Sequence, residues 1–169
     1  MPIPAPTPLI LLGVDPGTVR VGWGVIRKTG STLNIVDCGA IQVSAKKSIE
    51  FRLAEIYDGL EEVVATHRPV GAALEETFAG KNMKAAISMG QGRGVALLAL
   101  VRGKVPVLPL SPNEIKKAVT GQGHADKLLV ARMVCARLQL KELPQPADAT
   151  DALAAAIALA HRLPLDFKP

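Results

Sequence analysis

Apolar residues form short runs near the start of the chain and recur at helical spacing further on. The run 9–15 is apolar up to its last residue, and the segments 19–27 and 33–43 are rich in Val and Ile, with turn residues between them. These three segments predict three strands of an antiparallel sheet. Between 49 and 67, apolar residues recur every three or four positions, which indicates an amphipathic helix.

Strands and helices alternate in the remainder of the chain. Ser111 and Glu114 form a capping box with Pro112 in the first turn, and Gly121 and Gly123 end the helix that begins there. The other predicted elements are strands at 70–75 and 105–110 and helices at 82–102, 126–140 and 148–163. The pattern predicts an α/β fold with a five-stranded mixed sheet, in which three antiparallel strands are followed by two parallel ones, flanked by helices.

Length and composition fit one globular domain. The chain has 169 residues, of which 49% are hydrophobic and 21% charged, a composition that can bury a core. We place this domain at 9–163, after a proline-rich arm at 1–8 that we expect to be disordered, and before a short tail at 164–169. No apolar run approaches the roughly 20 residues of a spanning helix, and the start lacks a signal-peptide pattern, so we expect a cytoplasmic protein. Cys38 and Cys135 are predicted to be buried thiols.

Positive charge is concentrated in the middle of the chain. Residues 81–141 contain 11 Lys and Arg but only two acidic residues, Glu114 and Asp126, whereas the segments on either side are net acidic. A basic middle between acidic flanks suggests a surface that binds a polyanion next to a separate acidic site. The alternative is an ordinary solvated lysine-rich face, and charge alone does not decide between them.

Several acidic residues stand out because they follow or interrupt apolar segments. They are Asp15 at the end of the first strand, Glu75 and Glu76 at the end of the fourth, and Asp148 and Asp151 on one face of the last helix. Structural alternatives exist for two of them: Asp15 as a turn former and Asp148 as a helix N-cap. Strand periodicity does not choose between Glu75 and Glu76.

Acids from separate parts of the chain that meet at one edge of the sheet would share a pocket. Two like charges about 6 Å apart repel by roughly 3 kcal/mol at an effective dielectric of 20, so such a group must protonate or bind cations. Oxygen ligands suit Mg²⁺ or Mn²⁺, and two such ions activate water and stabilise the leaving oxygen in phosphodiester cleavage. The acids therefore predict metal-assisted hydrolysis of a nucleic-acid backbone.

Four strings carry a family resemblance: LLGVDPGTVRVGWGVI, ALEETFAGKN, MGQGRGVA and DATDALAAAI. In this order and at these separations they closely resemble the RuvC family of bacterial Holliday-junction resolvases, over about residues 9–163. The resemblance implies a ribonuclease H-like fold. It assigns metal binding and catalysis to Asp15, Glu75, Asp148 and Asp151, and leaves Glu76 out.

The resemblance also implies an activity and partners. It implies a homodimeric, Mg²⁺-dependent endonuclease with two ions per active site, for which Mn²⁺ substitutes. The expected substrate is a four-way (Holliday) DNA junction, cut in recombination and repair by paired nicks in strands of like polarity that leave 5′-phosphate and 3′-hydroxyl ends. A two-fold dimer matches the two-fold symmetry of an open junction. The RuvA/RuvB branch-migration complex is a candidate further partner.

An aromatic residue and several basic residues are candidate DNA contacts. Phe78 is expected to stack on a base or wedge the junction open, with a buried loop anchor as the alternative. The expected phosphate contacts are Lys81, Lys84, Arg93, Lys116 and Lys117, each of which an ordinary solvated cation also explains. By the resemblance, Lys116 and Lys127 lie close to the cleaved strand, and Lys127 has a catalytic role in offsetting transition-state charge.

The helix at 82–102 carries apolar residues on more than one stripe, which predicts a second buried face. We expect this face to form the dimer contact, with close backbone approach at Gly90, Gly92 or Gly94. A helix fully covered within the monomer is the alternative.

Two other functions are compatible with the sequence. A YqgF-type RNA-processing nuclease begins with a similar strand that ends in a DPG-like turn. A non-catalytic DNA-binding module would use the acidic residues only as caps and turn formers.

Overall fold

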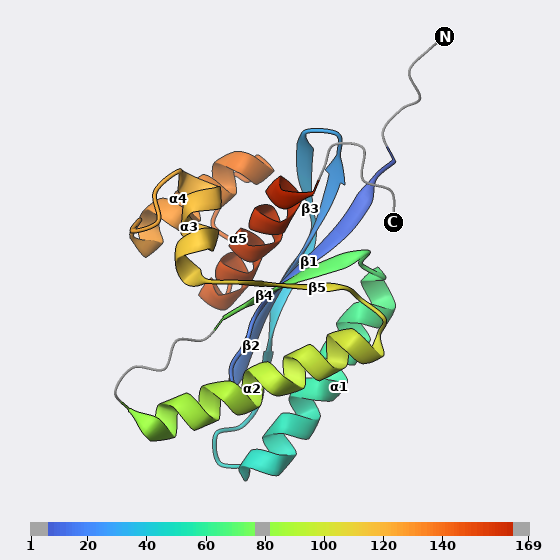
Figure 1. Cartoon of the computed structure of the whole chain (residues 1–169), viewed down its shortest axis with the longest axis vertical. Coiled ribbons are helices and arrows are strands. Elements are labelled where there is room, and N and C mark those ends of the chain that lie inside the picture. Colours follow the sequence, from blue (N-terminus) through green and yellow to red (C-terminus); the bar gives the residue numbers. More distant parts are fainter. Residues whose placement is uncertain (1–6, 77–81, 164–169) are drawn as a thin grey trace.

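Five strands form one mixed sheet in the computed structural model, which describes residues 7–76 and 82–163 (Figure 1). The strands are β1 (Leu9–Asp15), β2 (Arg20–Thr29), β3 (Thr32–Gln42), β4 (Gly71–Glu75) and β5 (Val107–Leu110). Their order across the sheet is β3-β2-β1-β4-β5. The first three strands are antiparallel, and β4 and β5 extend the sheet in parallel from β1. The predicted topology is confirmed.

Helices cover both faces of this sheet. They are α1 (Ile49–His67), α2 (Met83–Arg102), α3 (Pro112–Thr120), α4 (Lys127–Leu138) and α5 (Ala147–Arg162). Figure 1 shows α1 and α2 on one face and α3, α4 and α5 on the other. Successive strand residues point to opposite faces, so Leu11 belongs to the core under α5 while Leu12 belongs to the core under α1 and α2.

The long helix α5 packs unusually close to the sheet. Its buried residues are mostly alanine, and the strand residues beneath it include glycines. A Cβ at Gly13 would overlap the main-chain oxygen of Ala152, and a Cβ at Gly22 would overlap that of Asp148. Small side chains on both sides therefore let the helix backbone lie against β1 and β2, and this contact fixes where the acidic start of α5 sits.

Helix ends follow the predicted signals closely. Ser111 and Glu114 form the expected capping box at the start of α3, and Gly121 follows its last residue in the left-handed region, with φ of 82°. The predicted tail and residues 1–6 of the predicted arm lie outside the described residues. Among the described residues, no helix is long and apolar enough to cross a membrane.

The two cysteines differ from the prediction. Cys38 and Cys135 are free thiols, but each is partly exposed rather than buried. Cys38 lies on β3, which is an edge strand of the sheet. Cys135 lies on α4 but is not one of the residues that this helix buries, which are Val130, Val134 and Leu138. An edge strand and the flank of a surface helix both leave a side chain partly open to solvent, which explains the partial exposure of the two thiols.

Candidate active site

Asp15 and Glu75 end neighbouring parallel strands. Val14 is the register partner of Leu74, so the two acids, each one residue further along, reach the same edge of the sheet. Asp15 lies two residues after Gly13, which faces α5, and Glu75 lies two residues after Ala73, which belongs to the core under α5. Strand alternation therefore directs both carboxyl groups to the α5 side.

This register also separates the two adjacent glutamates. Glu75 lines the pocket beside Asp15, whereas Glu76 is not among the lining residues. The main-chain N–H of Glu76 donates to the oxygen of Leu110 at 2.8 Å, which continues the pairing of β4 with β5. Because successive residues of an extended chain alternate in direction, we expect the Glu76 side chain to point away from the side that Glu75 faces.

Helix α5 supplies the other two acids. Asp151 lines the same pocket and pairs with Lys127, with an Nζ–Oδ2 distance of 3.3 Å. Asp148 pairs with Arg20 at 3.2 Å between Oδ2 and Nη1. The N-cap of α5 is Pro146, so the alternative in which Asp148 is the cap residue is wrong: the helix has already begun at Asp148.

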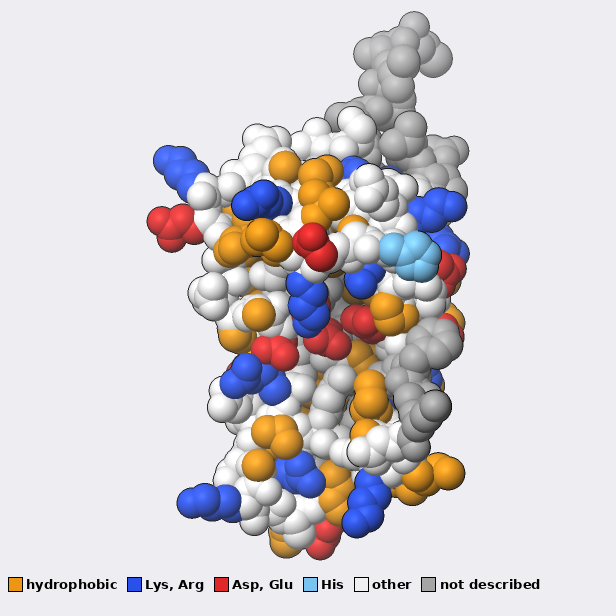
Figure 2. Space-filling view, turned by 90° about the vertical axis from the view of Figure 1, so that its left-hand side faces the viewer, with side chains coloured by type: hydrophobic (Ala, Val, Ile, Leu, Met, Phe, Trp, Pro, Cys, Tyr) orange, Lys and Arg blue, Asp and Glu red, His pale blue; other side chains and the backbone are white. Residues whose placement is uncertain are grey.

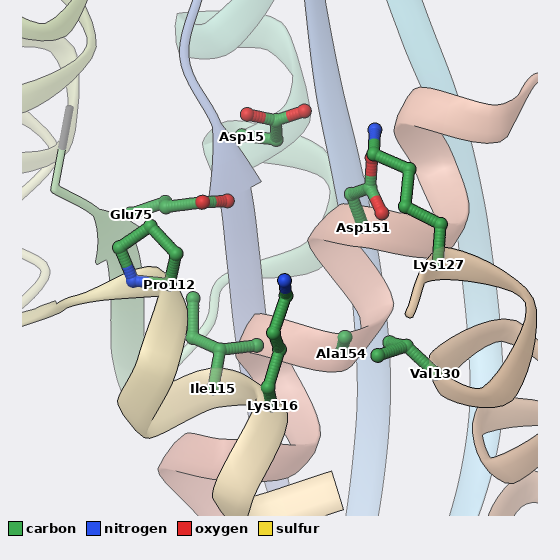
Figure 3. A pocket seen from close by; sticks show the side chains of 9 residues that line it. All are labelled: Asp15, Glu75, Pro112, Ile115, Lys116, Lys127, Val130, Asp151 and Ala154. Atoms are coloured by element: carbon green, nitrogen blue, oxygen red, sulfur yellow. The ribbon is translucent and has the colours of Figure 1, made fainter. Parts of the chain in front are cut away.

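The pocket between these elements has a volume of about 240 Å³. Figure 3 shows the carboxyl groups of Asp15, Glu75 and Asp151 and the amino groups of Lys116 and Lys127 directed toward a common space. Apolar side chains from α3, α4 and α5 complete the wall: Pro112, Ile115, Val130 and Ala154. In the space-filling view, acidic side chains gather in the middle of this side of the molecule with basic side chains beside them (Figure 2).

Burial and mutual repulsion make two of these carboxyl groups unusually weak acids. The pKa of Asp15 rises to about 7, first because of its burial and then because of the charges of Glu75, Asp151 and Asp148, while Lys127 opposes the rise. The pKa of Glu75 rises to about 6 through burial and the charge of Asp151. The nearby lysines therefore do not neutralise the acids fully, and the site favours additional positive charge.

The residues present fit a hard divalent cation. All four acids offer carboxylate oxygens, the ligands that Mg²⁺ and Mn²⁺ prefer. Within residues 7–76 and 82–163, no three acidic, histidine or cysteine side chains already surround one point as a metal cage. Two of the four carboxylates are instead directed at basic side chains, Asp148 at Arg20 and Asp151 at Lys127.

The predicted DNA contacts divide into two groups. Lys116 and Lys127 line the pocket, whereas Lys117 and Lys84 are exposed and Arg93 is half-buried, and none of these three is part of the pocket lining. Phe78 and Lys81 lie outside the described residues.

One of the three glycines considered for the dimer contact does not fit that role. Gly92 is buried within its own chain, because a Cβ there would overlap the main-chain oxygen of Gly17. Gly90 and Gly94 have nothing within 4 Å of an added Cβ, so both remain available to a second chain.

Sequence reasoning missed Arg20 and the glycines under α5. Arg20 is two residues before Gly22 on β2, so both face the same side of the sheet. The sequence does not show that Asp148 lies on that side, because this depends on where α5 packs. Gly13 and Gly22 alternate with apolar residues in the two strands, and that alternation was the available signal for a close helix contact.

Comparisons with known proteins identify the family of this chain. The family model described as RuvC, crossover junction endodeoxyribonuclease, matches residues 11–161. The crossover junction endodeoxyribonuclease RuvC of Roseiflexus sp. is 42% identical over 154 residues, covering 91% of this chain and 92% of the relative. The same protein from Chloroflexus aggregans is 45% identical over 153 residues, covering 90% and 93%.

Solved structures give the same result. The structure of Thermus thermophilus RuvC in complex with a Holliday junction substrate superposes with a TM-score of 0.83 at 33% identity, covering 89% of this chain and 92% of that one. The yeast mitochondrial Holliday junction resolvase Ydc2 shares the fold, with a TM-score of 0.65 at 9% identity over 93% and 80% of the two chains. The expected ribonuclease H-like architecture is confirmed. From its sequence and its fold alike, the chain belongs to the RuvC family of crossover junction endodeoxyribonucleases.

Proposed function

We propose that this nuclease resolves four-way DNA junctions by paired, metal-dependent nicks in two strands of like polarity, leaving 5′-phosphate and 3′-hydroxyl ends. The observation that carries the proposal is the gathering of Asp15, Glu75 and Asp151 around one pocket, where burial and like charge raise the pKa of Asp15 to about 7. The family match supports the choice of a DNA junction over the YqgF-type RNA alternative.

Asp15, Glu75, Asp148 and Asp151 are the proposed metal ligands, for two Mg²⁺ ions that Mn²⁺ can replace. When bound, such ions lower the pKa of an attacking water and stabilise the leaving oxygen. The protein's own part is to hold four carboxylates from three elements within reach of one phosphodiester. The apolar wall of Ile115 and Val130 limits the access of bulk water to that space.

Lys116 and Lys127 are the proposed phosphate contacts within the pocket. Both amino groups are directed into it (Figure 3), so each can approach an oxygen of the strand that the acids surround. Lys127 is the proposed catalytic lysine, because a cation next to the reacting phosphate offsets charge that grows in the transition state. The remaining proposed contacts outside the pocket are Phe78, Lys81, Lys84, Arg93 and Lys117.

Helix α2 is the proposed dimer contact. Ile87, Leu98 and Val101 are 58%, 51% and 57% exposed, and at 100° per residue they fall on one face together with Gly90 and Gly94. An apolar stripe with two uncovered glycines suits close packing against the same helix of a second copy. A two-fold dimer would place two acidic pockets on the two-fold symmetric junction. The RuvA/RuvB complex stays a candidate partner from the resemblance alone.

A comparison of three substrates tests this function. Wild-type protein and Asp15→Asn are incubated with Mg²⁺ and an immobile four-way junction, a linear DNA duplex or a structured RNA, and cuts are mapped on every strand. We expect symmetric cuts in the junction by the wild type, and binding without cutting by Asp15→Asn. Preferential cutting of RNA would favour the YqgF-type alternative, and tight binding without cutting by the wild type would favour a non-catalytic module.

A further inference from the structure

Arg20 contacts one of the four acids from outside the pocket. It is the first residue of β2, and strand alternation places it on the same face as Gly22, which lies under the main chain of Asp148. Its guanidinium group donates from Nη1 to Oδ2 of Asp148 at 3.2 Å and from Nη2 to Oε1 of Gln42 at 3.4 Å. Gln42 is the register partner of Arg20 in the sheet. The arginine is thus held by an uncharged neighbour while it pairs with the acid.

The two acids of α5 therefore have one basic partner each, but the partners differ in position. Lys127 and its partner Asp151 both line the pocket, whereas neither Arg20 nor its partner Asp148 is among the lining residues. The side chains of Arg20 and Asp148 are 44% and 29% exposed, which places their contact at the rim of the site. Arg20 can leave this contact without any rearrangement of the core.

We propose that Arg20 competes with the metal ion for Asp148 and thereby lowers the metal affinity of the free protein. This inference rests on the proposed function, since it takes Asp148 to be a metal ligand. Arg20 engages one of the two carboxylate oxygens that Asp148 could offer to a cation, and the positive charge of a guanidinium within a few ångströms repels a divalent ion. An arginine does not lose its charge in proteins, so Arg20 keeps its attraction for the Asp148 carboxylate throughout the neutral pH range.

Metal binding to the free protein, without DNA, tests the proposal. Mn²⁺ affinity is measured by electron paramagnetic resonance on the full chain for the wild type, Arg20→Gln and Arg20→Lys. We expect Arg20→Gln to bind Mn²⁺ about three- to fivefold more tightly, which is the upper part of the range that an exposed ion pair can contribute. Arg20→Lys, which keeps the charge, should stay within about twofold of the wild type.

Arg27→Gln is the matched control. Arg27 is an exposed arginine on the same strand, and seven residues at about 3.3 Å each place it roughly 23 Å from Arg20. The Arg27→Gln substitution removes the same net charge at a position far from the acids, so the Mn²⁺ affinity of this variant should equal that of the wild type. Equal tightening in both variants would show a general charge effect and overturn the proposal.

Two further results would also overturn it. Unchanged Mn²⁺ binding by Arg20→Gln would mean that Arg20 has no influence on the ion, and weaker binding would mean that it orients Asp148 for the ion rather than competing with it. A loss of junction affinity in EDTA as large as that of Lys116→Gln would make Arg20 an ordinary phosphate contact, whereas we expect Arg20→Gln to retain wild-type affinity there. Failure of the wild type to bind Mn²⁺ would instead contradict the proposed function itself.

Discussion

Gly22 lies directly beneath Asp148, so close that a Cβ on the glycine would overlap the main-chain oxygen of the acid. Gly22 is also the register partner of Asp15 on the neighbouring strand. A single glycine therefore sets the distance between a strand that ends in one acid and a helix that carries another acid in its first turn. The position of the acidic pocket depends on this contact between backbone atoms, which no rotation of a side chain can relieve.

Gly22→Ala is expected to push the start of α5 away from the sheet. We expect a loss of about 1–3 kcal/mol in the free energy of unfolding, because the added methyl group meets main-chain atoms, together with a loss of junction nicking. Gly71→Ala is the control, since its added Cβ would have no neighbour closer than 3.8 Å. Urea unfolding and a nicking assay on both variants check this. Equal stability of the two variants would contradict it.

Metal-free Asp15→Asn is expected to be more stable than the wild type at neutral pH, and equally stable near pH 4. The pKa of Asp15 rises from 3.8 to about 7 in the folded protein, so the folded state binds more protons than the unfolded state between these values. The stability that this group contributes is present at low pH and is lost as the pH rises toward 7.

The difference between Asp15→Asn and the wild type should therefore grow across that window, to about 1–3 kcal/mol for a group that is only partly shielded from solvent. Urea unfolding in EDTA at a series of pH values measures it. Addition of Mg²⁺ should stabilise the wild type and not the variant. A difference that does not vary with pH would contradict the raised pKa.

Lys127→Ala is expected to slow single-turnover nicking about 100-fold, in the range for loss of one charge-stabilising group, while junction affinity in EDTA changes little. Lys117→Ala is the matched control, because Lys117 is an exposed lysine of α3 that does not line the pocket. The expected contrast is a change in rate for Lys127 and only a small change in affinity for Lys117. Similar losses of rate in both variants would argue against a catalytic role for Lys127.

Leu98→Glu is expected to disrupt the dimer, because it places a charge in the apolar stripe of α2, where Leu98 is 51% exposed. Val36→Glu, which changes an exposed apolar residue on β3, should leave the dimer intact. Sedimentation equilibrium measures the association of both variants. In the junction assay, Leu98→Glu should no longer make the two cuts of one junction together. Dimers that persist in this variant during sedimentation would exclude the α2 stripe as the dimer contact.

Local signals in the sequence predicted most of the fold. The bounds of α1 agree with the predicted helix at 49–67, because apolar spacing and a following proline mark both the face and the end. The capping box placed the start of α3 in the same way. By contrast, β5 begins at Val107 rather than at 105, since the extent of a strand depends on its partner and not on its own residues alone.

The site was predicted in kind but not in detail. Acids at strand ends indicated the pocket, but the choice of Glu75 over Glu76 depends on the register between β1 and β4, which single strands do not encode. Gly92 was one of three alternatives for a dimer contact and packs against Gly17 of its own chain. A glycine's sequence position does not reveal which backbone approaches it. Arg20 was missed for the same reason: its partner Asp148 is 128 positions away.

Metal binding by the four acids is tested most directly by calorimetric titration of the DNA-free protein with Mn²⁺. The titration is made on the wild type and on Asp15→Asn, Glu75→Gln, Asp148→Asn, Asp151→Asn and Glu76→Gln. We predict that the wild type takes up Mn²⁺, that each of the first four substitutions weakens its affinity about tenfold or more, and that Glu76→Gln binds as the wild type does. An absence of Mn²⁺ uptake by the wild type, or the same affinity in all five variants, would contradict the account.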